Sequence, residues 1–521
     1  MSAGTGDSAA RAVAAAILLA CLGFYAVTTW HWPLVGDASL MHYVAFLMDH
    51  GMRPYRDIAE INMPGAMLVD RLVMHTLGGG SMAWRIFDLL LLGVGIAAMV
   101  EIARPRSWFA GLWAGVLLGL IHGRDGIFDA GQRDFVVAVL LLLGFAALFR
   151  ATRGGWPGWA AVFGLCAGCA AAIKPTYLLL GPAVLVALAV WRGNGGGEIT
   201  RSQLASYRVT QWSSYGVSGF AAPLVAVTLW LWRMGVLSDF VRVSRTLVAY
   251  HASLAHRSLG YLLLHSIAPL LPLVAVWVVV VVAFEREAWR SWERFALAIG
   301  VGVGLISYVA QAKGYPYQRY PLLALLLLVM GMDFAAATQR AAATRVLGWA
   351  AIAYGVLYLA PVSAWAASRY DWRNLEFQNA LVADLDRLGG AGLPGQGLSG
   401  QVQCIDTIGG CQGALYRMRL VQSSGWMYDE FLFGAERGDV VAASRQRFWA
   451  AFEARPPRVI IVVDGLFPAG PAGFGKLALW PEFDAELERN YRIEDEVTPP
   501  DAVYWWARKD EPRSYRVYVR K

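Results

Sequence analysis

The chain has 521 residues, of which 57% are hydrophobic and only 16% are charged, and its formal net charge is +7. Soluble domains usually carry about 25% charged residues, and the long stretches here without any charge argue against a purely soluble protein. The basic residues lie mostly in short loops between apolar stretches. This pattern indicates orientation in a membrane and argues against nucleic-acid binding.

Eleven apolar segments are predicted to cross the membrane as helices, because each is too long and too apolar for a surface helix. The first apolar run, Ala12 to Thr29, is long for the core of a cleaved signal peptide and is interpreted as a signal anchor. The eleven approximate ranges are 11–30, 82–102, 107–122, 134–149, 157–173, 176–192, 213–233, 262–284, 295–311, 321–338 and 346–366.

Alternate loops between these segments are rich in arginine, so the positive-inside rule places them and the N-terminus in the cytoplasm. Because the number of segments is odd, the C-terminal part is then expected outside. The cytoplasmic set comprises Arg104 and Arg106, Arg150 and Arg153, Arg192, Arg201 and Arg208, Arg286, Arg290 and Arg294, and Arg340 and Arg345.

The C-terminal part changes character from about Ser368, where charges become frequent and helix-like and strand-like patterns alternate. The sequence therefore predicts a membrane domain over 1–366 and an extracytoplasmic α/β domain over 367–521. A helix is expected at 377–388 and another at 445–454, with strands at 401–405, 458–464, 501–509 and 514–521.

Two of the five cysteines, Cys404 and Cys411, fall in this C-terminal domain. On an oxidising side of the membrane they could form a small-loop disulfide. Two free thiols fit the sequence equally well.

The loops on the outer side combine acids, bases and aromatic residues. The first, His31 to Ser81, carries Asp37 near its start, and its stretch Leu40 to Met48 is a candidate helix in the membrane interface. Ionisable groups at membrane depth are costly unless they pair or face a cavity. The outer acids are Asp37, Asp57, Asp125, Asp129 and Asp134, and the outer bases are Arg53, Arg56, Arg124, Arg133, Lys174, Lys313 and Arg319.

This one-sided set of charges suits an amphiphilic substrate with an anionic head group. The bases would hold a phosphate by charge-assisted hydrogen bonds, and an acid would accept a proton from an attacking group. The histidines show no metal-binding spacing and no nucleotide-binding loop occurs in a credible context, so neither a zinc site nor a nucleotide-driven mechanism is predicted.

Each of these residues also has a structural interpretation. Asp37 could simply cap the helix that follows it, and Arg133 and Asp134 could serve the start of a span, where an acid complements the helix dipole. Lys174, before Pro175, could be a lysine that extends to the membrane surface.

The loop from Gln311 to Pro321 has a structural alternative of its own. It places Lys313 and Arg319 among tyrosines and prolines, a composition that also fits an aromatic belt at the interface.

Four motifs in order give a resemblance to a known family. The first outer loop carries Gly36-Asp37, Tyr43, Gly51, Pro54-Tyr55, Asp57 and Pro64. Asp129 with Arg133-Asp134 precedes the fourth span, Lys174-Pro175 ends the fifth, and a late loop reads QAKGYPYQRYP. Together they resemble the glycosyltransferase C superfamily, which includes lipid A aminoarabinose transferases and protein O-mannosyltransferases, over roughly residues 11–366.

The sequence departs from the family pattern at two places. Ala38 follows Asp37 where the family usually has a Glu, and Gln318 stands near a position where a His is common. A metal or second-acid role beside Asp37, and a His role at 318, are therefore not carried over. No cofactor is predicted, and a divalent metal is left open.

The resemblance implies a membrane glycosyltransferase at the outer face of the cytoplasmic (inner) membrane. It would move a sugar from a polyprenyl-phosphate donor to a hydroxyl of a glycan, lipid or protein acceptor, with inversion, and Asp37 would be the general base. Asp129 and Asp134 are further catalytic candidates. The implied substrate-binding residues are Tyr55, Asp57, Arg133, Lys174, Lys313, Tyr317 and Arg319.

Two other functions remain open from the sequence. A polymerase or ligase of surface polysaccharide would share the outer cations. A transporter or flippase of lipid-linked sugars would be expected to show two related halves and polar residues near mid-membrane, and neither is evident here.

Overall fold

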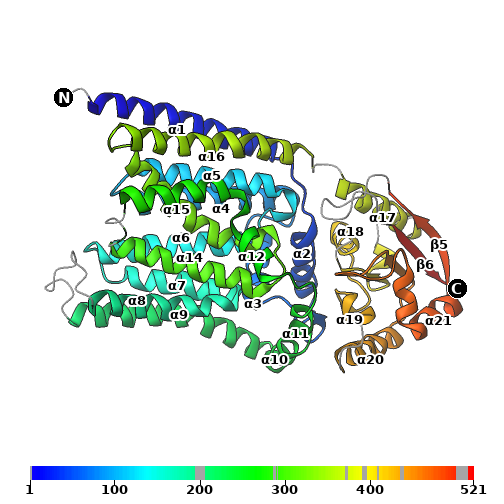
Figure 1. The fold of residues 1–521 in the computed structure, drawn as a ribbon. Coiled ribbons are helices and arrows are strands. Elements are labelled where there is room, and N and C mark those ends of the chain that lie inside the picture. Colours follow the sequence, from blue (N-terminus) through cyan, green and yellow to red (C-terminus); the bar gives the residue numbers. More distant parts are fainter. Residues whose placement is uncertain are drawn as a thin grey trace.

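A computed structural model shows a long helical bundle with a C-terminal α/β part at one end (Figure 1). The structure describes residues 3–193, 206–285, 289, 291–369, 373–389, 396–407, 410–434, 439–499 and 514–521. All eleven apolar segments predicted from the sequence are helical within these ranges, and the polytopic helical fold is thereby confirmed.

Eight stretches of helix are long and apolar enough to cross a membrane, judged by length and composition in the described residues. They lie in α1 (Ala3–Thr28), α4 (Ser81–Ala103), α6 (Arg133–Thr152), α9 (Ser206–Arg233), the run from α12 (Leu259–Ile267) through α13 (Leu271–Val280) to Phe284, α14 (Trp292–Gln311), η6 with α15 (Pro316–Arg319 and Tyr320–Ala337), and α16 (Ala342–Arg369).

The other three predicted spans form shorter or more polar helices, so the number of spans stays a prediction. The helix α5 (Trp108–Asp125) ends in a polar turn, and α7 (Trp159–Ile173) has only 15 residues. The third is the pair η2 (Pro175–Leu179) and α8 (Leu180–Gly193).

Glycines bring α7 and α9 into close contact. A Cβ atom at Gly164 would overlap the carbonyl oxygen of Gly216, and one at Gly219 would overlap that of Ala161. In a membrane, where lipid tails are as apolar as leucine, such small residues let helix backbones approach and gain van der Waals contact.

The first outer loop contains the predicted helix as α2 (Gly36–Asp49), which lies across the end of the bundle, between it and the C-terminal part (Figure 1). Its residues from Ala38 to Met48 are all buried. The helix therefore has protein on both sides. A second helix of this loop, α3 (Pro64–Thr76), begins with a proline at its first position, which suits a helix start.

The C-terminal part contains a four-stranded sheet in the order β2-β4-β6-β5. The strand β2 (Val402–Ile405) is parallel to β4 (Val459–Val463), while β6 (Tyr515–Arg520) is antiparallel to both β4 and β5 (Tyr491–Val497). Around the sheet lie α17 (Arg373–Gly389), α18 (Cys411–Met418), α19 (Glu430–Phe433), α20 (Asp439–Ala454) and α21 (Pro481–Asn490).

The sequence predicted most of these elements. The helices at 377–388 and 445–454 and the strands at 401–405, 458–464 and 514–521 are confirmed, whereas the strand expected at 501–509 lies outside the described residues. The prediction missed β5, whose sequence YRIEDEV is too charged to resemble a buried strand. Because β5 lies at the edge of the sheet, it tolerates charged side chains, and these charges also discourage pairing with the edge strand of another chain.

A short strand pair joins the first outer loop to the C-terminal part. The strand β1 (Ile58–Ala59) pairs in parallel with β3 (Gly425–Trp426). Only glycine fits at Gly425, because a Cβ there would overlap the carbonyl oxygen of Asp57.

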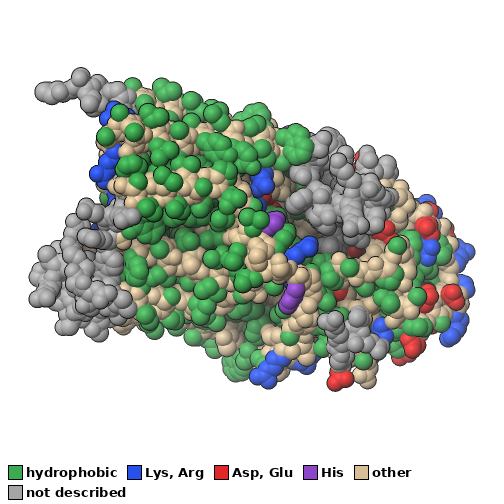
Figure 2. All heavy atoms as spheres, in the orientation of Figure 1, with side chains coloured by type: hydrophobic (Ala, Val, Ile, Leu, Met, Phe, Trp, Pro, Cys, Tyr) green, Lys and Arg blue, Asp and Glu red, His purple; other side chains and the backbone are tan. Residues whose placement is uncertain are grey.

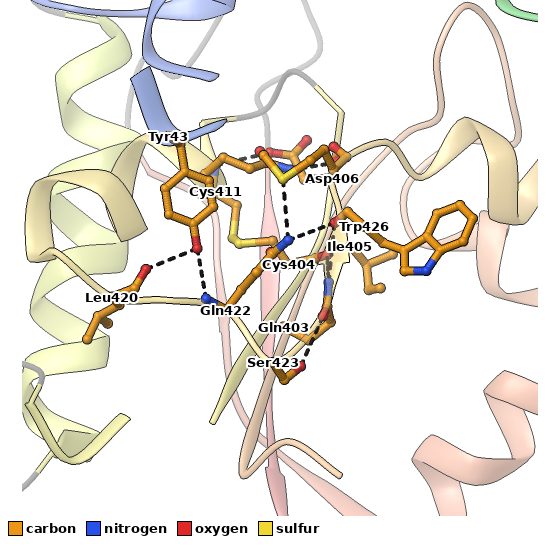
Figure 3. Close-up of a disulfide and its surroundings, with 12 residues drawn as sticks. Tyr43, Gln403, Cys404, Ile405, Asp406, Cys411, Leu420, Gln422, Ser423 and Trp426 are labelled. Carbon is orange, nitrogen blue, oxygen red and sulfur yellow. Dashed lines mark hydrogen bonds between the residues drawn. A yellow bond between two sulfur atoms is a disulfide. The ribbon is translucent and has the colours of Figure 1, made fainter. Parts of the chain in front are cut away.

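Tyr43 on α2 makes a second connection between the same two parts (Figure 3). Its hydroxyl donates to the Leu420 carbonyl at 3.0 Å and accepts from the Gln422 amide at 2.9 Å, in a fully buried position. We expect Tyr43→Phe to leave two buried backbone groups without a partner and to lower the free energy of unfolding by about 1–3 kcal/mol. Thermal unfolding in detergent measures this loss of stability. Tyr354→Phe serves as the control, because Tyr354 lies on the exposed face of α16.

Cys404 and Cys411 form a disulfide, so the open choice between bonded and free thiols is settled in favour of the bond (Figure 3). It connects the end of β2 to the start of α18, the helix that packs on α2.

By restricting the unfolded chain, closure of so short a loop stabilises by about 2 kcal/mol. The double substitution of both cysteines by serine is expected to lower the melting temperature measured without reductant. A reducing agent should then lower the melting temperature of the wild type but leave that of the variant unchanged.

Candidate functional site

The predicted outer charges gather where the bundle meets the C-terminal part. Figure 2 shows an apolar surface over the bundle and a group of Lys, Arg and His side chains at this boundary. The first turn of α2, the start of α6 and the loops before η2 and η6 all contribute to it. Acidic and basic side chains of the predicted outer loops thus gather at this end of the bundle, as the sequence indicated.

Asp37 lies in the first turn of α2, and its carboxylate faces partners from two other elements. Its Oδ2 accepts from Arg133 Nη2 at 3.1 Å and from the Tyr317 hydroxyl at 3.4 Å. No described residue donates to Oδ1, and 27% of the side chain is exposed. The helix cap is Val35, without a side-chain hydrogen bond, so the interpretation of Asp37 as a helix cap is wrong.

Arg133, the first residue of α6, connects Asp37 to a buried polar cluster. It also donates to Asn62 Oδ1, and the Asn62 side-chain amide in turn donates to Glu60 at 2.5 Å. The Tyr428 hydroxyl, from the C-terminal part, donates to Glu60 at 3.1 Å. Burial raises the pKa of Glu60 above its ordinary value. This cluster holds the Arg133 guanidinium in place beside Asp37.

Lys174 and Asp134 form a buried ion pair, with Nζ and Oδ2 separated by 3.0 Å. Lys174 also donates to Gln311 Oε1. The lysine is therefore held inside the protein, and the interpretation of it as a side chain extending to the membrane surface is wrong. The Asp134 side chain is fully buried, which suits a charge partner for Lys174, and its catalytic role stays a prediction.

Arg319 is likewise committed to a carboxylate. Its Nη2 donates to Asp125 Oδ1 at 2.7 Å and its Nη1 to the His265 carbonyl at 3.2 Å. Both charged side chains are buried.

Asp129 lies in a buried loop close to this pair and accepts from the Tyr320 hydroxyl at 3.5 Å. Burial, together with the nearby Asp125, raises the pKa of Asp129 well above its ordinary value. A carboxyl group in this environment favours its protonated form. Its catalytic role stays a prediction.

Lys313 differs from the other predicted cations, because no described carboxylate lies within ion-pair distance of its ammonium. Its Nζ contacts His251 Nε2, while His251 Nδ1 lies 2.5 Å from Glu430 Oε1. The ammonium also lies 5.3 Å from the centre of the Phe467 ring. Burial lowers the pKa of Lys313 to about 8. The anionic group of a ligand placed here could therefore pair with the Lys313 ammonium, because no described carboxylate neutralises it.

The two remaining predicted binding residues, Tyr55 and Asp57, lie in different surroundings. Tyr55 is buried and donates to the Asn62 carbonyl at 2.7 Å, which places it behind the Arg133 cluster. Asp57 pairs with Arg53 at 3.1 Å, and its side chain is 35% exposed. The structure therefore does not bring Asp57 together with Asp37, and no contact supports its predicted binding role.

Four residues of this site that were not predicted from the sequence lie next to the β1–β3 pair. Glu60 and Asn62 follow β1, while Tyr428 and Glu430 follow β3, so the β1–β3 pair brings them together. Glu430 stands in a run of aromatic and apolar residues, YDEFLF, where a charge is unexpected, and that was the available signal. Among the described residues, no group of three or more His, Cys, Asp or Glu side chains could hold a metal ion.

The apolar helices and the C-terminal α/β part define a polytopic helical membrane protein. No family matches the sequence, and no curated protein matches it either. The similarity is found among solved structures, at identities that establish the fold alone.

One similar structure is ArnT from Cupriavidus metallidurans bound to undecaprenyl phosphate, with 13% identity, 99% of this chain and 98% of that chain covered, and a TM-score of 0.59. The apo state of the same protein gives a TM-score of 0.56 at the same identity and coverage. A third is the archaeal oligosaccharyltransferase AglB from Archaeoglobus fulgidus, in complex with an inhibitory peptide and a dolichol-phosphate. Its identity is 11%, the coverage 95% and 75%, and the TM-score 0.54.

Proposed function

We propose that this protein is a membrane glycosyltransferase that moves a sugar from a polyprenyl-phosphate donor to an acceptor hydroxyl, with inversion at the anomeric carbon. The observation that carries the proposal is the Asp37 carboxylate, partly exposed and oriented by Arg133 and Tyr317, beside a set of cations at the end of an apolar bundle. The structures of ArnT with undecaprenyl phosphate and AglB with dolichol-phosphate support this donor class.

Asp37 would act as the general base. Its Oδ2 is held by two donors, so Oδ1 can accept the hydrogen bond of an acceptor hydroxyl. As the hydroxyl oxygen attacks the anomeric carbon, its proton passes to Asp37 and the bond from the anomeric carbon to the lipid phosphate breaks. Attack from the side opposite to the phosphate inverts the anomeric centre.

Lys313 would stabilise the departing phosphate. Lys174 and Arg319 already neutralise Asp134 and Asp125, whereas the contacts of the Lys313 ammonium among the described residues are the His251 ring and the face of Phe467. A positive group placed where charge develops, with little water around it, is worth far more than the same group in bulk solvent. Arg133 would assist from the other side of Asp37.

The proposed orientation puts the N-terminus in the cytoplasm, the domain 367–521 outside, and the reaction at the outer face of the inner membrane. It is supported by the distribution of charge between the two ends of the bundle. Glu293 binds Arg106 at 2.6 Å and Arg153 at 2.7 Å, so these predicted cytoplasmic loops meet. Figure 2 shows Lys and Arg at that end, away from the C-terminal part.

The direct test is sugar transfer by the purified protein in liposomes that contain a panel of polyprenyl-phosphate sugars and candidate acceptors. The proposal expects release of polyprenyl phosphate together with a new glycoside. Movement of the intact lipid-linked sugar between leaflets, with no release of phosphate from any donor, would instead favour a flippase.

A further inference from the structure

A cavity lies outside the site described above, between the first outer loop and α20. It has a volume of about 310 Å³, and β1 and β3 contribute Ala59, Gly425 and Trp426 to its wall. Its charged lining residues are Arg56, Asp57, Arg447 and Arg455.

The charges around this cavity do not balance. Arg56 pairs with Asp239 at 2.7 Å, and Asp57 pairs with Arg53. Arg447 donates to the Arg56 carbonyl at 3.1 Å, but no described carboxylate lies within ion-pair distance of Arg447 or Arg455. Two guanidinium groups are therefore available to an anion, and a guanidinium binds a carboxylate or phosphate through two parallel hydrogen bonds.

The rest of the lining suits a sugar ring. Met52, Ala451 and Ala454 provide apolar surface, and Trp426 lies beside them under the Arg447 guanidinium, whose carbon is 5.9 Å from the ring centre. Ligand sites commonly combine such apolar walls with a few polar groups that fix orientation. A saccharide that carries an acidic group has both complementary features.

The cavity and the Asp37 site share the β1–β3 pair. Ala59 and Trp426 are partners in this pair and line the cavity, while Glu60 and Tyr428, just beyond them, form the cluster that holds Arg133. We infer that this cavity binds an acidic saccharide, whose carboxylate or phosphate lies between Arg447 and Arg455, and, resting on the proposed transferase function, that this saccharide belongs to the acceptor.

The experiment measures binding to the full-length protein in detergent without any donor, so that its result does not depend on catalysis. Saturation-transfer difference NMR would compare methyl β-D-glucuronide with the neutral methyl β-D-glucoside. We expect saturable binding of the glucuronide only, weakened by added salt as for any exposed ion pair. Inorganic phosphate should displace it only at concentrations well above the Kd of the glucuronide.

Three variants identify the site. Arg447→Gln and Arg455→Gln are each expected to weaken binding at least about tenfold, the effect of losing one charge-assisted hydrogen bond. Arg455 is exposed, so its substitution carries little risk to folding. Arg458→Gln, an exposed arginine outside the cavity lining, should bind like the wild type.

Several results would overturn the inference. Among them are the absence of saturable glucuronide binding, equal binding of the neutral glucoside, and unchanged affinity in Arg455→Gln and Arg447→Gln. Inorganic phosphate that binds as tightly as the glucuronide would remove the saccharide from the assignment. A donor-dependent transfer assay that fails while glucuronide still binds would count against the proposed function and leave this cavity as a saccharide site.

Discussion

Replacing Asp37 with asparagine is expected to lower the kcat for sugar transfer by about 10²–10⁴-fold, the usual contribution of a positioned general base. The amide keeps the shape of the side chain and can still accept from Arg133 and Tyr317 through its oxygen, so the fold should persist. The acceptor hydroxyl would then have no carboxylate to take its proton. Initial rates of glycoside formation in proteoliposomes measure the effect at saturating donor.

The chain supplies a matched control for this substitution. Asp49 lies at the other end of the same helix α2, where its carboxylate pairs with Arg71 at 2.8 Å and does not contact the Asp37 cluster. Asp49→Asn should retain near wild-type kcat. Equal rates for Asp37→Asn and wild type, with an intact melting temperature, would reject Asp37 as the base and direct attention to Asp129 and Asp134.

Lys313→Met is expected to lower kcat by about 10²–10³-fold, as for the loss of one electrostatic group that stabilises a developing anion. Methionine fills a similar volume against Phe467 but carries no charge. Lys313→Arg, which restores a cation, should recover a large part of the rate. The comparison of these two variants separates the loss of charge from the loss of packing.

The pH dependence gives a second readout for Lys313. Burial lowers its pKa to about 8, so the ammonium is charged below that pH and loses its proton above it. The wild-type rate should therefore fall above about pH 8, towards tenfold per pH unit. Arginine stays protonated throughout this range, so Lys313→Arg should lose this decline. The same decline in both proteins would assign it to a different group.

Local sequence predicted the parts of this structure that depend on local physics. A stretch of about 18 or more residues without Asp, Glu, Lys or Arg has one favourable environment, which is why the helices at 12–29 and 262–284 were predictable. The expectation that acids and bases such as Asp37 and Arg133 lie at one end of the bundle followed from the cost of placing charges near lipid. The orientation of each side chain did not follow, because it depends on contacts among α2, α6 and η6.

For a related reason, the sequence could not predict which residues contact the predicted cations. Lys174 meets Gln311, and Lys313 reaches Glu430 through His251, only because distant helices end at the same level. No periodicity encodes such a pairing. The charged edge strand β5 and the two-residue strands β1 and β3 escaped prediction because their patterns are too short or too polar to be distinguished from loops.

The hydrogen bond between Tyr43 and Leu420 has a consequence for biosynthesis. The two residues are 377 positions apart, so at a translation rate of about 5–20 residues per second the first outer loop waits roughly 20–75 s for its partner strand and carbonyl. Asp37 belongs to that loop. Every membrane helix is synthesised before the C-terminal residues that complete the surroundings of Asp37. A ribosome that stops before residue 420 would therefore leave an inserted bundle without a finished site, and the proposed activity would start only after the C-terminal part has been synthesised.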